Sequence, residues 1–323
     1  MHSLTPVFRR ACAGLALLAS VLVAWPAVAA GCPNGQAQAT QFVQFQSPNL
    51  ATSPPSLLTI KGKLSYPGSF DGAQRCIGTR KLPAVLILHG SSGVDSRGDF
   101  YQQALNAAGI VTLQIDMWEA RGVTGLSNRP SAPILTYPDA FSALALLANL
   151  PEVDGNRVGV LGFSWGGVIS LAAAERLYTG SFGGGRRFAA HVANYPVCYG
   201  ANNTTIPQLQ PPERSGTRLL QLTGAPVLIQ IGTNDDYDNG SARCRELADT
   251  LNPSNNGVIQ VQEYEGAYHA WDRIMVPVVA ADIFANQGSF FFTGVPPTIR
   301  IVPNVPQALE ARAKAVQFFK QKL

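Results

Sequence analysis

Charged residues are scarce in this sequence: Asp, Glu, Lys and Arg make up 14% of its 323 residues, and no run of basic residues occurs. Two of the 24 Lys and Arg residues, Arg9 and Arg10, lie near the start, and the 22 that follow nearly balance 20 acidic ones. Proteins that bind nucleic acid usually carry a basic patch or stripe. The even balance therefore gives no reason to expect nucleic acid as a partner.

Histidine and cysteine are also few, with four His and five Cys. None of them shows the short spacing of a zinc site, so we expect no metal. The chemistry inferred below requires no cofactor either. After the N-terminus, no apolar run approaches the length that a bilayer needs, so we expect no stable membrane insertion.

The N-terminus has the pattern of an export signal. Arg9 and Arg10 precede an apolar stretch, 11–23, and small residues follow at 27–31. This order predicts a signal peptide over residues 1–30, cleaved near Ala29 or Ala30, and a secreted or periplasmic single domain, 31–323. An uncleaved anchor is one alternative. A lipoprotein modified at Cys32 is a weaker one, because Ala29 fits poorly where a lipidation signal usually has Leu.

The rest of the chain alternates short apolar runs with helix-length segments, and it shows no internal repeat. The apolar runs are 84–88, 110–115, 158–163, 189–193, 227–231 and 258–261. The expected helices are 100–108, 139–150, 168–178, 241–251 and 305–323. This alternation predicts an α/β fold: a doubly wound, mostly parallel sheet with helices on both faces. Before it, 36–55 is expected as an arm, with a strand at 57–64 that can pair with 42–45.

The residues just after these apolar runs carry the strongest motif. Gly162, Ser164 and Gly166 form Gly-x-Ser-x-Gly between the run 158–163 and an Ala-rich helix. A serine on a tight strand-to-helix turn needs glycines on either side, because a Cβ there would obstruct close backbone contacts. We therefore expect Ser164 to be a nucleophile; the alternative is an incidental tight turn.

A serine nucleophile needs a base and an orienting acid, in the chain order Ser, acid, His. His269 is the histidine in the required place, while His89 and His191 precede any acid loop and fit structural roles. The acid is expected after the run 227–231, where Asp235, Asp236 and Asp238 compete, and spacing does not choose among them.

Two further features follow from the same placement. The oxyanion hole is expected from the backbone N–H groups of Trp165 and Ser91. Four cysteines of the exported chain suggest two disulfides, among three pairings. Cys198 and Cys244 should lie near one edge of the crevice, so we expect the pairs Cys198–Cys244 and Cys32–Cys76.

Taken together, the residues resemble the dienelactone hydrolase family of α/β-hydrolases over roughly 57–271. The marks are the stretches 154–167, 232–237, 244–249 and 264–271. The resemblance implies the α/β-hydrolase fold and Asp235 as the acid. Enzymes acting on dienelactone use a cysteine nucleophile, where this chain has Ser164, and a glutamate in the loop that here holds Gly90 and Ser91. A general carboxylic ester hydrolase is therefore the better expectation.

We thus expect a serine esterase acting on a small-molecule ester through an acyl-enzyme. Acyl transfer or peptide cleavage by the same triad, and a non-catalytic binding module, are the alternatives. Candidates for shaping the substrate cleft, each also compatible with packing, are Trp118, Arg121, Tyr137, Trp165 and Trp271. The segment 272–306, which contains Phe290–Phe292, is expected either as a flap or as a loop that packs on the body. Nothing in the sequence indicates the oligomeric state.

Overall fold

The computed structural model describes residues 39–67, 70–71, 74–75, 81–201, 203, 206 and 221–323. Its centre is an eight-stranded sheet with the strand order β1-β2-β6-β5-β7-β8-β9-β10. The six strands from β6 to β10 run parallel, and β1 and β2 extend the sheet antiparallel at one edge. The strands are β1 (Ala39–Asn49), β2 (Ser56–Tyr66), β5 (Leu82–Leu88), β6 (Val111–Asp116), β7 (Val153–Phe163), β8 (Ala190–Asn194), β9 (Val227–Gly232) and β10 (Ile259–Tyr264).

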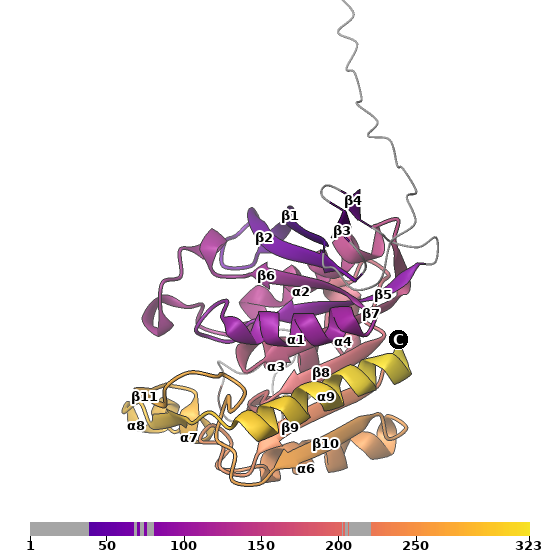
Figure 1. The fold of residues 1–323 in the computed structure, drawn as a ribbon. Coiled ribbons are helices and arrows are strands. Elements are labelled where there is room, and N and C mark those ends of the chain that lie inside the picture. The colour runs from indigo at the N-terminus through magenta and orange to yellow at the C-terminus, as the bar shows by residue number, and fades with distance from the viewer. Residues whose placement is uncertain are drawn as a thin grey trace, which may run out of the picture. The chain divides into compact units, whose positions relative to one another are not determined.

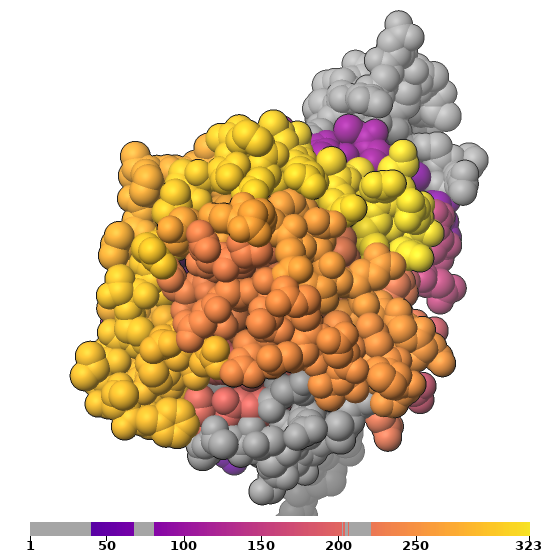
Figure 2. Space-filling view, turned by 90° about the horizontal axis from the view of Figure 1, so that it is seen from below, coloured from indigo at the N-terminus to yellow at the C-terminus, as the bar shows by residue number. Residues whose placement is uncertain are grey.

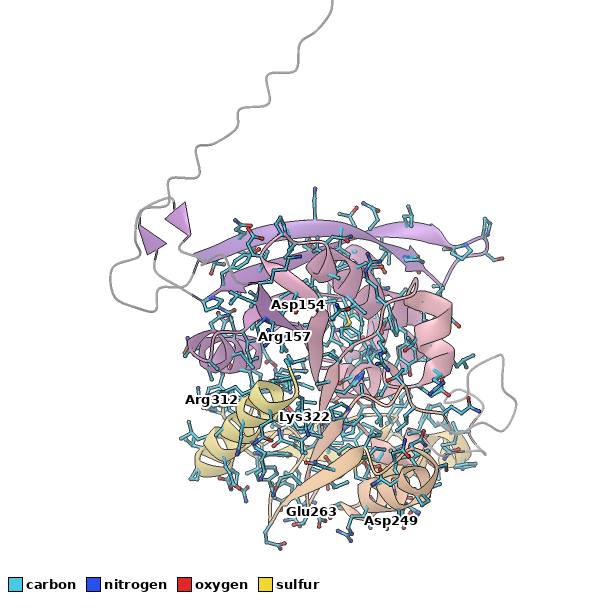
Figure 3. The ribbon with its side chains drawn as sticks, turned by 90° about the vertical axis from the view of Figure 1, so that its right-hand side faces the viewer. Asp154, Arg157, Asp249, Glu263, Arg312 and Lys322 are labelled. Atoms are coloured by element: carbon cyan, nitrogen blue, oxygen red, sulfur yellow. A yellow bond between two sulfur atoms is a disulfide. The ribbon has the colours of Figure 1, made fainter. Side chains whose placement is uncertain are left out.

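The central strands are mostly apolar because both of their faces are covered. Every residue of β8 and β9 is buried, as a parallel sheet between two helix layers requires. Figures 1 and 3 show α1 and α9 on one face of the sheet and α2 and α3 on the other. The helices are α1 (Ser96–Ala107), α2 (Tyr137–Ala148), α3 (Trp165–Ala172), α4 (Arg176–Phe182), α5 (Cys198–Ala201), α6 (Ala242–Leu251), α7 (Ala285–Gly288), α8 (Phe290–Thr293) and α9 (Val305–Lys322). The fold is the predicted mostly parallel α/β-hydrolase architecture.

The C-terminal helix α9 is fastened near its middle and at its C-terminal end. The Arg312 guanidinium, near the middle, lies 4.1 Å from the centroid of the Phe100 ring in α1, and it donates to the Phe100 carbonyl at 3.2 Å. At the C-terminal end, Arg157 of β7 donates to the carbonyl of Leu323. Arg157 and Arg312 are labelled in Figure 3. These contacts close one face of the sheet, away from the strand ends that carry the motif.

Two predicted elements differ in the structure. Residues 39–49 are not an arm: β1 pairs with β2 along its whole length, in the register Val43 with Gly62. The single helix expected over 168–178 is two helices, α3 and α4, with a break at Ala173–Glu175. There the Thr223 amide donates to the carbonyl of Ala174 at 2.8 Å, and the Glu175 side chain accepts from the amide of Leu177 at the start of α4. A remote segment thus ends the helix.

The segment 272–306 has secondary structure of its own. Strands β11 (Val278–Ala281) and β12 (Thr298–Ile301) form an antiparallel pair, and α7 and α8 lie between them in the chain. Figure 2 shows this yellow-orange segment beside the orange surface that includes α6. Short elements elsewhere are β3 (Phe70–Asp71), β4 (Gln74–Arg75) and the 3-10 helices Glu119–Arg121, Leu126–Asn128, Pro133–Thr136 and Asn252–Ser254.

The structure contains the predicted Cys198–Cys244 disulfide, with a Cα–Cα distance of 5.1 Å. It links α5 to α6. The predicted partners Cys32 and Cys76, and the signal sequence, lie outside the described residues. None of the helices among the described residues combines the length and the apolar character needed to cross a bilayer.

Candidate active site

Ser164 occupies the sharp turn between β7 and α3. Its backbone has φ +51° and ψ −107°, a sparsely populated conformation for a residue with a Cβ. The flanking glycines make the turn sterically possible: a Cβ on Gly162 would lie 1.9 Å from the Gly166 carbonyl oxygen, and one on Gly166 would lie 2.4 Å from that of Leu88. The turn is therefore a built feature of the chain and not an incidental bend.

Neighbouring strands hold this turn from both sides. The Ser164 amide donates to the carbonyl of Asn194, at the end of β8, at 3.0 Å, and the Gly166 amide donates to the carbonyl of His89, after β5, at 3.1 Å. The turn is thus fixed to the ends of the strands on either side of β7. Little of the Ser164 side chain is open to solvent, since the residue is 7% exposed.

A continuous chain of hydrogen bonds joins the three predicted side chains. His269 Nε2 lies 2.9 Å from Ser164 Oγ, and His269 Nδ1 lies 2.7 Å from Asp235 Oδ2. The other Asp235 oxygen accepts from the Tyr237 amide at 2.8 Å. All three residues are buried. This is the geometry of a nucleophile, a base and an orienting acid.

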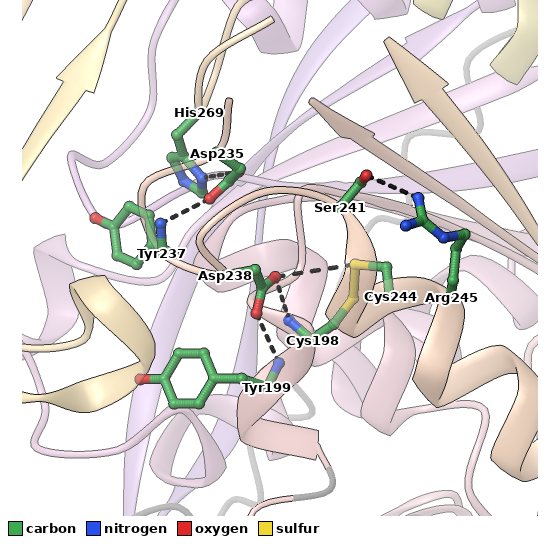
Figure 4. The surroundings of a disulfide bond; sticks show 9 residues. All are labelled: Cys198, Tyr199, Asp235, Tyr237, Asp238, Ser241, Cys244, Arg245 and His269. Carbon is green, nitrogen blue, oxygen red and sulfur yellow. Dashed lines mark hydrogen bonds and ion pairs between the residues drawn. A yellow bond between two sulfur atoms is a disulfide. The ribbon is translucent and has the colours of Figure 1, made fainter. Parts of the chain in front are cut away.

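The structure separates the three competing aspartates. Asp235 alone among them contacts His269; Asp236 turns away and forms a bidentate ion pair with Arg300. Asp238 accepts from the amides of Cys198 and Tyr199, each at 2.7 Å, as Figure 4 shows. Asp238 therefore holds the first turn of α5 and not the histidine.

Asp238 lies in an unusual electrostatic position. Burial and, to a smaller extent, the nearby Asp235 carboxylate raise the pKa of its carboxyl to about 7, although the two amide hydrogen bonds lower it. Cys198, Asp238 and Cys244 also form a cluster of potential metal ligands. Both sulfurs are bonded to each other, so the cluster does not offer two thiolates to a metal.

The expected oxyanion loop runs beside the nucleophile. A Cβ on Gly90 would lie 3.5 Å from Ser164 Cβ, which places the loop that continues to Ser91 next to the serine. The Trp118 indole donates to the Ser91 carbonyl at 3.0 Å and so braces this loop. Trp165 is the first residue of α3, where backbone N–H groups have no acceptor within the helix. The roles of both amides stay predictions.

The other two histidines have the structural contacts expected of them. His89 Nδ1 donates to the Gly90 carbonyl at 2.8 Å, and Nε2 accepts from the Met117 amide at 3.0 Å. Burial lowers the pKa of His89. His191 is fully buried in β8, and its Nδ1 donates to the Ser170 carbonyl at 2.9 Å. Burial lowers the pKa of His191 to about 4.

The candidate cleft residues have diverse surroundings. Trp118 and Trp165 pack edge to face, 5.5 Å apart between centroids, beside the nucleophile turn and its loop. Arg121 instead forms a bidentate ion pair with the fully buried Asp139, and Tyr137 packs on Tyr178 of α4. These contacts give Arg121 and Tyr137 structural roles. Their predicted part in binding substrate is not supported by any contact with the three hydrogen-bonded residues.

Trp271 is fully buried and packs on two tyrosine rings, edge to face on Tyr195 at 5.2 Å and tilted on Tyr264 at 4.8 Å between centroids. Tyr195 in turn packs on the His269 ring at 4.7 Å. Trp271 thus lies behind the histidine, one ring removed from it. Its predicted contact with substrate stays a prediction.

Sequence reasoning missed the residues that surround His269. Tyr195 follows β8 directly and Tyr237 lies two residues after Asp235, so both occupy the strand ends where functional residues gather. The rings of Tyr195 and Tyr237 flank the imidazole, at 4.7 and 4.2 Å between centroids. Their position after strands was a usable signal, but their contact with His269 depends on loops that no local pattern predicts.

The segment 272–306 is anchored beside this site. Asp282 forms a bidentate pair with Arg129, at 2.6 and 2.8 Å, and accepts from the Tyr237 hydroxyl at 2.9 Å. Phe284 lies 6.3 Å from Trp165 between ring centroids. Both Arg129 and Asp282 are nearly fully buried. The segment packs on the body through these contacts, and its action as a flap stays a prediction.

The fold and the site define an α/β-hydrolase with a serine at the nucleophile position. A sequence profile of the dienelactone hydrolase family matches residues 76–321. The chain belongs to this family.

Individual relatives are distant. The chain is 30% identical over 99 residues to an uncharacterized protein of Pseudomonas aeruginosa (strain ATCC 15692), a match covering 30% of this chain and 27% of that protein. It thus spans about a quarter of that relative's length.

Three solved structures have a similar fold. A dienelactone hydrolase-like promiscuous phosphotriesterase from metagenomic libraries has a TM-score of 0.52 and 16% identity, with 88% of this chain and 99% of that one covered. The Pyrobaculum calidifontis esterase has a TM-score of 0.52 and 16% identity, with 87% of this chain and 85% of that one covered. Thermogutta terrifontis esterase 2 has a TM-score of 0.54 and 15% identity, with 86% of this chain and 94% of that one covered.

Proposed function

We propose that the protein is an exported serine hydrolase that cleaves small carboxylic esters through an acyl-enzyme. The observation that carries the proposal is the buried chain of hydrogen bonds from Ser164 through His269 to Asp235. Each part of that chain has the residue type and the distance that acyl transfer needs. A binding module without catalysis would have no use for a strained serine aligned with a base.

The geometry suggests the following course. Ser164 Oγ attacks the ester carbonyl while His269 Nε2 takes the hydroxyl proton. Asp235 holds the other ring nitrogen as N–H and so fixes the tautomer. Amides of Trp165 and Ser91 receive the negative charge on the carbonyl oxygen. The tetrahedral intermediate collapses, the alcohol leaves with the proton from His269, and a water molecule then releases the acid by the same steps.

The decisive experiment is the Ser164→Ala variant. We expect a folded protein whose turnover of p-nitrophenyl esters falls by several orders of magnitude. The oxyanion site alone should still accelerate hydrolysis about 10³-fold over the reaction in water. A fluorophosphonate probe should label the wild type and not the variant. Near-wild-type turnover in the variant would refute the nucleophile, and an unlabelled, inactive wild type would favour the binding module. Adding an alcohol or an amine as acceptor tests acyl transfer, and a peptide substrate tests peptidase activity.

A further inference from the structure

The imidazole of His269 lies between two buried tyrosine rings. Tyr195 meets it edge to face, at an interplanar angle of 65°, and Tyr237 is tilted by 41° on it. Ser164 and Asp235 make hydrogen bonds with the two ring nitrogens. These two groups hold the nitrogens, and the two tyrosines restrict rotation of the ring plane, which two hydrogen bonds alone leave partly free.

Each of these tyrosines is itself fixed by a buried carboxylate. The Tyr195 hydroxyl donates to Asp272 at 2.6 Å and accepts from Arg97 at 3.0 Å. The Tyr237 hydroxyl donates to Asp282, the partner of Arg129. Burial raises the pKa of both phenols well above the ordinary value, so they stay neutral donors. Two sets of residues thus hold the tyrosines beside His269, and we call them the two arms. One arm is Tyr195 with Asp272 and Arg97, and the other is Tyr237 with Asp282 and Arg129.

The backbone gives an independent sign that Tyr195 is held for a purpose. It has φ +40°, in the left-handed region that a residue with a bulky side chain rarely adopts. The Tyr195 amide donates to the Gln230 carbonyl at 2.7 Å, which keeps the strained residue in place. Such strain persists where the surrounding structure over-determines it, most often at functional sites.

We propose that Tyr195 and Tyr237 are positioning residues for His269. They keep the imidazole plane aligned with both Ser164 and Asp235 while the ring gains and loses a proton. The proposal rests on the proposed function, because it assigns a task that matters only if His269 is the base. It extends the site by the two arms, which tie the base to the loop of Asp235 and to the segment 272–306.

The contacts predict an asymmetry between the two hydroxyls. Without the Tyr237 hydroxyl, Asp282 keeps three donors, two from Arg129 and one from the Phe284 amide. Without the Tyr195 hydroxyl, Asp272 keeps Tyr101 and a 3.4 Å contact from Asn194, and one Arg97 nitrogen loses its acceptor. Tyr195→Phe should therefore lower kcat more than Tyr237→Phe, although both variants keep the ring.

The test compares the variants Tyr195→Leu, Tyr237→Leu and the two Phe variants with Tyr178→Leu. Tyr178 is a buried tyrosine whose ring packs edge to face on Tyr137, whereas the His269 ring packs on Tyr195 and Tyr237. The Tyr178→Leu variant is the control for core damage. For each protein, end-point labelling with a fluorophosphonate counts the intact sites, and kcat per site and KM are measured on one p-nitrophenyl ester. The low-field proton resonance of His269 Nδ1–H reports the histidine–aspartate bond directly.

Each Leu variant should lose about 10²-fold in kcat per labelled site, the scale of a 1 Å misplacement, with KM nearly unchanged and the low-field resonance broadened. Tyr178→Leu should match the wild type per site. Wild-type kcat per site in both Leu variants, or a loss confined to KM, overturns the positioning role. If the Leu variants do not fold, the order of the two Phe variants decides, and an equal or reversed order overturns it. Failure of the proposed function has a different signature, namely turnover that survives Ser164→Ala.

Discussion

Asp235 and Asp236 are adjacent in the chain and differ in every contact. Asp235 is 1% exposed and holds His269, whereas Asp236 binds the half-exposed Arg300. Asp235→Asn keeps the shape but favours the wrong imidazole tautomer, so turnover should fall by about 10⁴-fold, as in the serine protease precedent. Asp236→Asn should mainly cost a small amount of stability, because solvent screens this exposed ion pair.

This contrast between Asp235→Asn and Asp236→Asn is checked by measuring two quantities for both variants: turnover on one activated ester and the thermal midpoint. Loss of activity in Asp236→Asn together with full activity in Asp235→Asn would exchange the two assignments. The sequence alone left the choice open because three aspartates fit the loop, and only the family resemblance favoured the first. Asp236 points away from His269 because it pairs with Arg300, which lies 64 residues after it in the chain.

His191 gives the fold a dependence on pH. Its pKa is lowered from 6.5 to about 4 by burial, so below pH 6.5 the unfolded chain binds a proton that the folded protein refuses. The stability that a neutral His191 contributes is therefore complete above about pH 6.5 and is lost as the pH falls toward 4. At one pKa unit per 1.4 kcal/mol, the loss is about 3 kcal/mol.

The His191→Leu variant removes the titrating group. Its thermal midpoint should fall less than that of the wild type between about pH 7 and about pH 4.5. Ser164→Ala keeps all histidines and should follow the wild type. Parallel curves for wild type and His191→Leu would show that His191 does not titrate differently in the two states. The sequence predicted a core histidine here, since it sits within an apolar run, but not the size of the effect.

Among the elements, α5 and α6 are joined by the Cys198–Cys244 disulfide, which closes a loop with a sequence separation of 46. A loop of this size limits the unfolded chain, so replacing both cysteines by serine should cost about 4 kcal/mol of unfolding free energy. The Asp238 carboxylate binds the amides at the start of α5, and these contacts should still hold α5 when the disulfide is absent.

Chemical unfolding of the double variant beside the wild type measures the cost. The matched control is the Cys32→Ser/Cys76→Ser protein, which keeps the α5–α6 link. Equal stability of the wild type and the Cys198/Cys244 variant would mean that the link does not constrain the unfolded chain.

The sequence pattern predicted the strands of the central sheet better than it predicted where helices end. Every apolar run of the central sheet is a strand in the structure, because burial on both faces leaves a strong local signature. The break between α3 and α4 escaped prediction, because it is imposed by hydrogen bonds from the segment near Thr223. The pair β11–β12 was also missed: its strands are four residues long, with a helical stretch between them.

At the scale of the whole molecule, the strand–helix alternation was enough to predict the parallel sheet and its two helix layers. It placed Ser164, Asp235 and His269 at strand ends that the fold brings together. It did not predict the anchoring of 272–306, because that anchoring uses Arg129 and Asp236, both distant in the sequence. Long-range polar contacts of this kind leave no periodic trace.

Export is a property of the whole chain that we propose from its first 30 residues. Expression with the native N-terminus in a bacterial host should give a processed protein in the periplasm or medium, starting near Ala30 or Gly31. N-terminal sequencing checks the cleavage site, and intact-mass measurement detects a diacylglyceryl group on Cys32. A cytosolic protein that keeps Arg9 and Arg10 would contradict the proposal.

Two of the ion pairs that anchor the segment 272–306, Asp236–Arg300 and Arg129–Asp282, differ in their access to solvent. The Arg300 side chain of the pair with Asp236 is 51% exposed, while Arg129 and Asp282 are 5% and 1% exposed. Dissolved ions screen the first pair and hardly reach the second. Rising ionic strength should therefore loosen the hairpin of β11 and β12 while Phe284 stays seated on Trp165. We therefore expect the segment to stay attached to the body at Asp282, while the strand pair β11–β12 moves further from the body as the salt concentration rises.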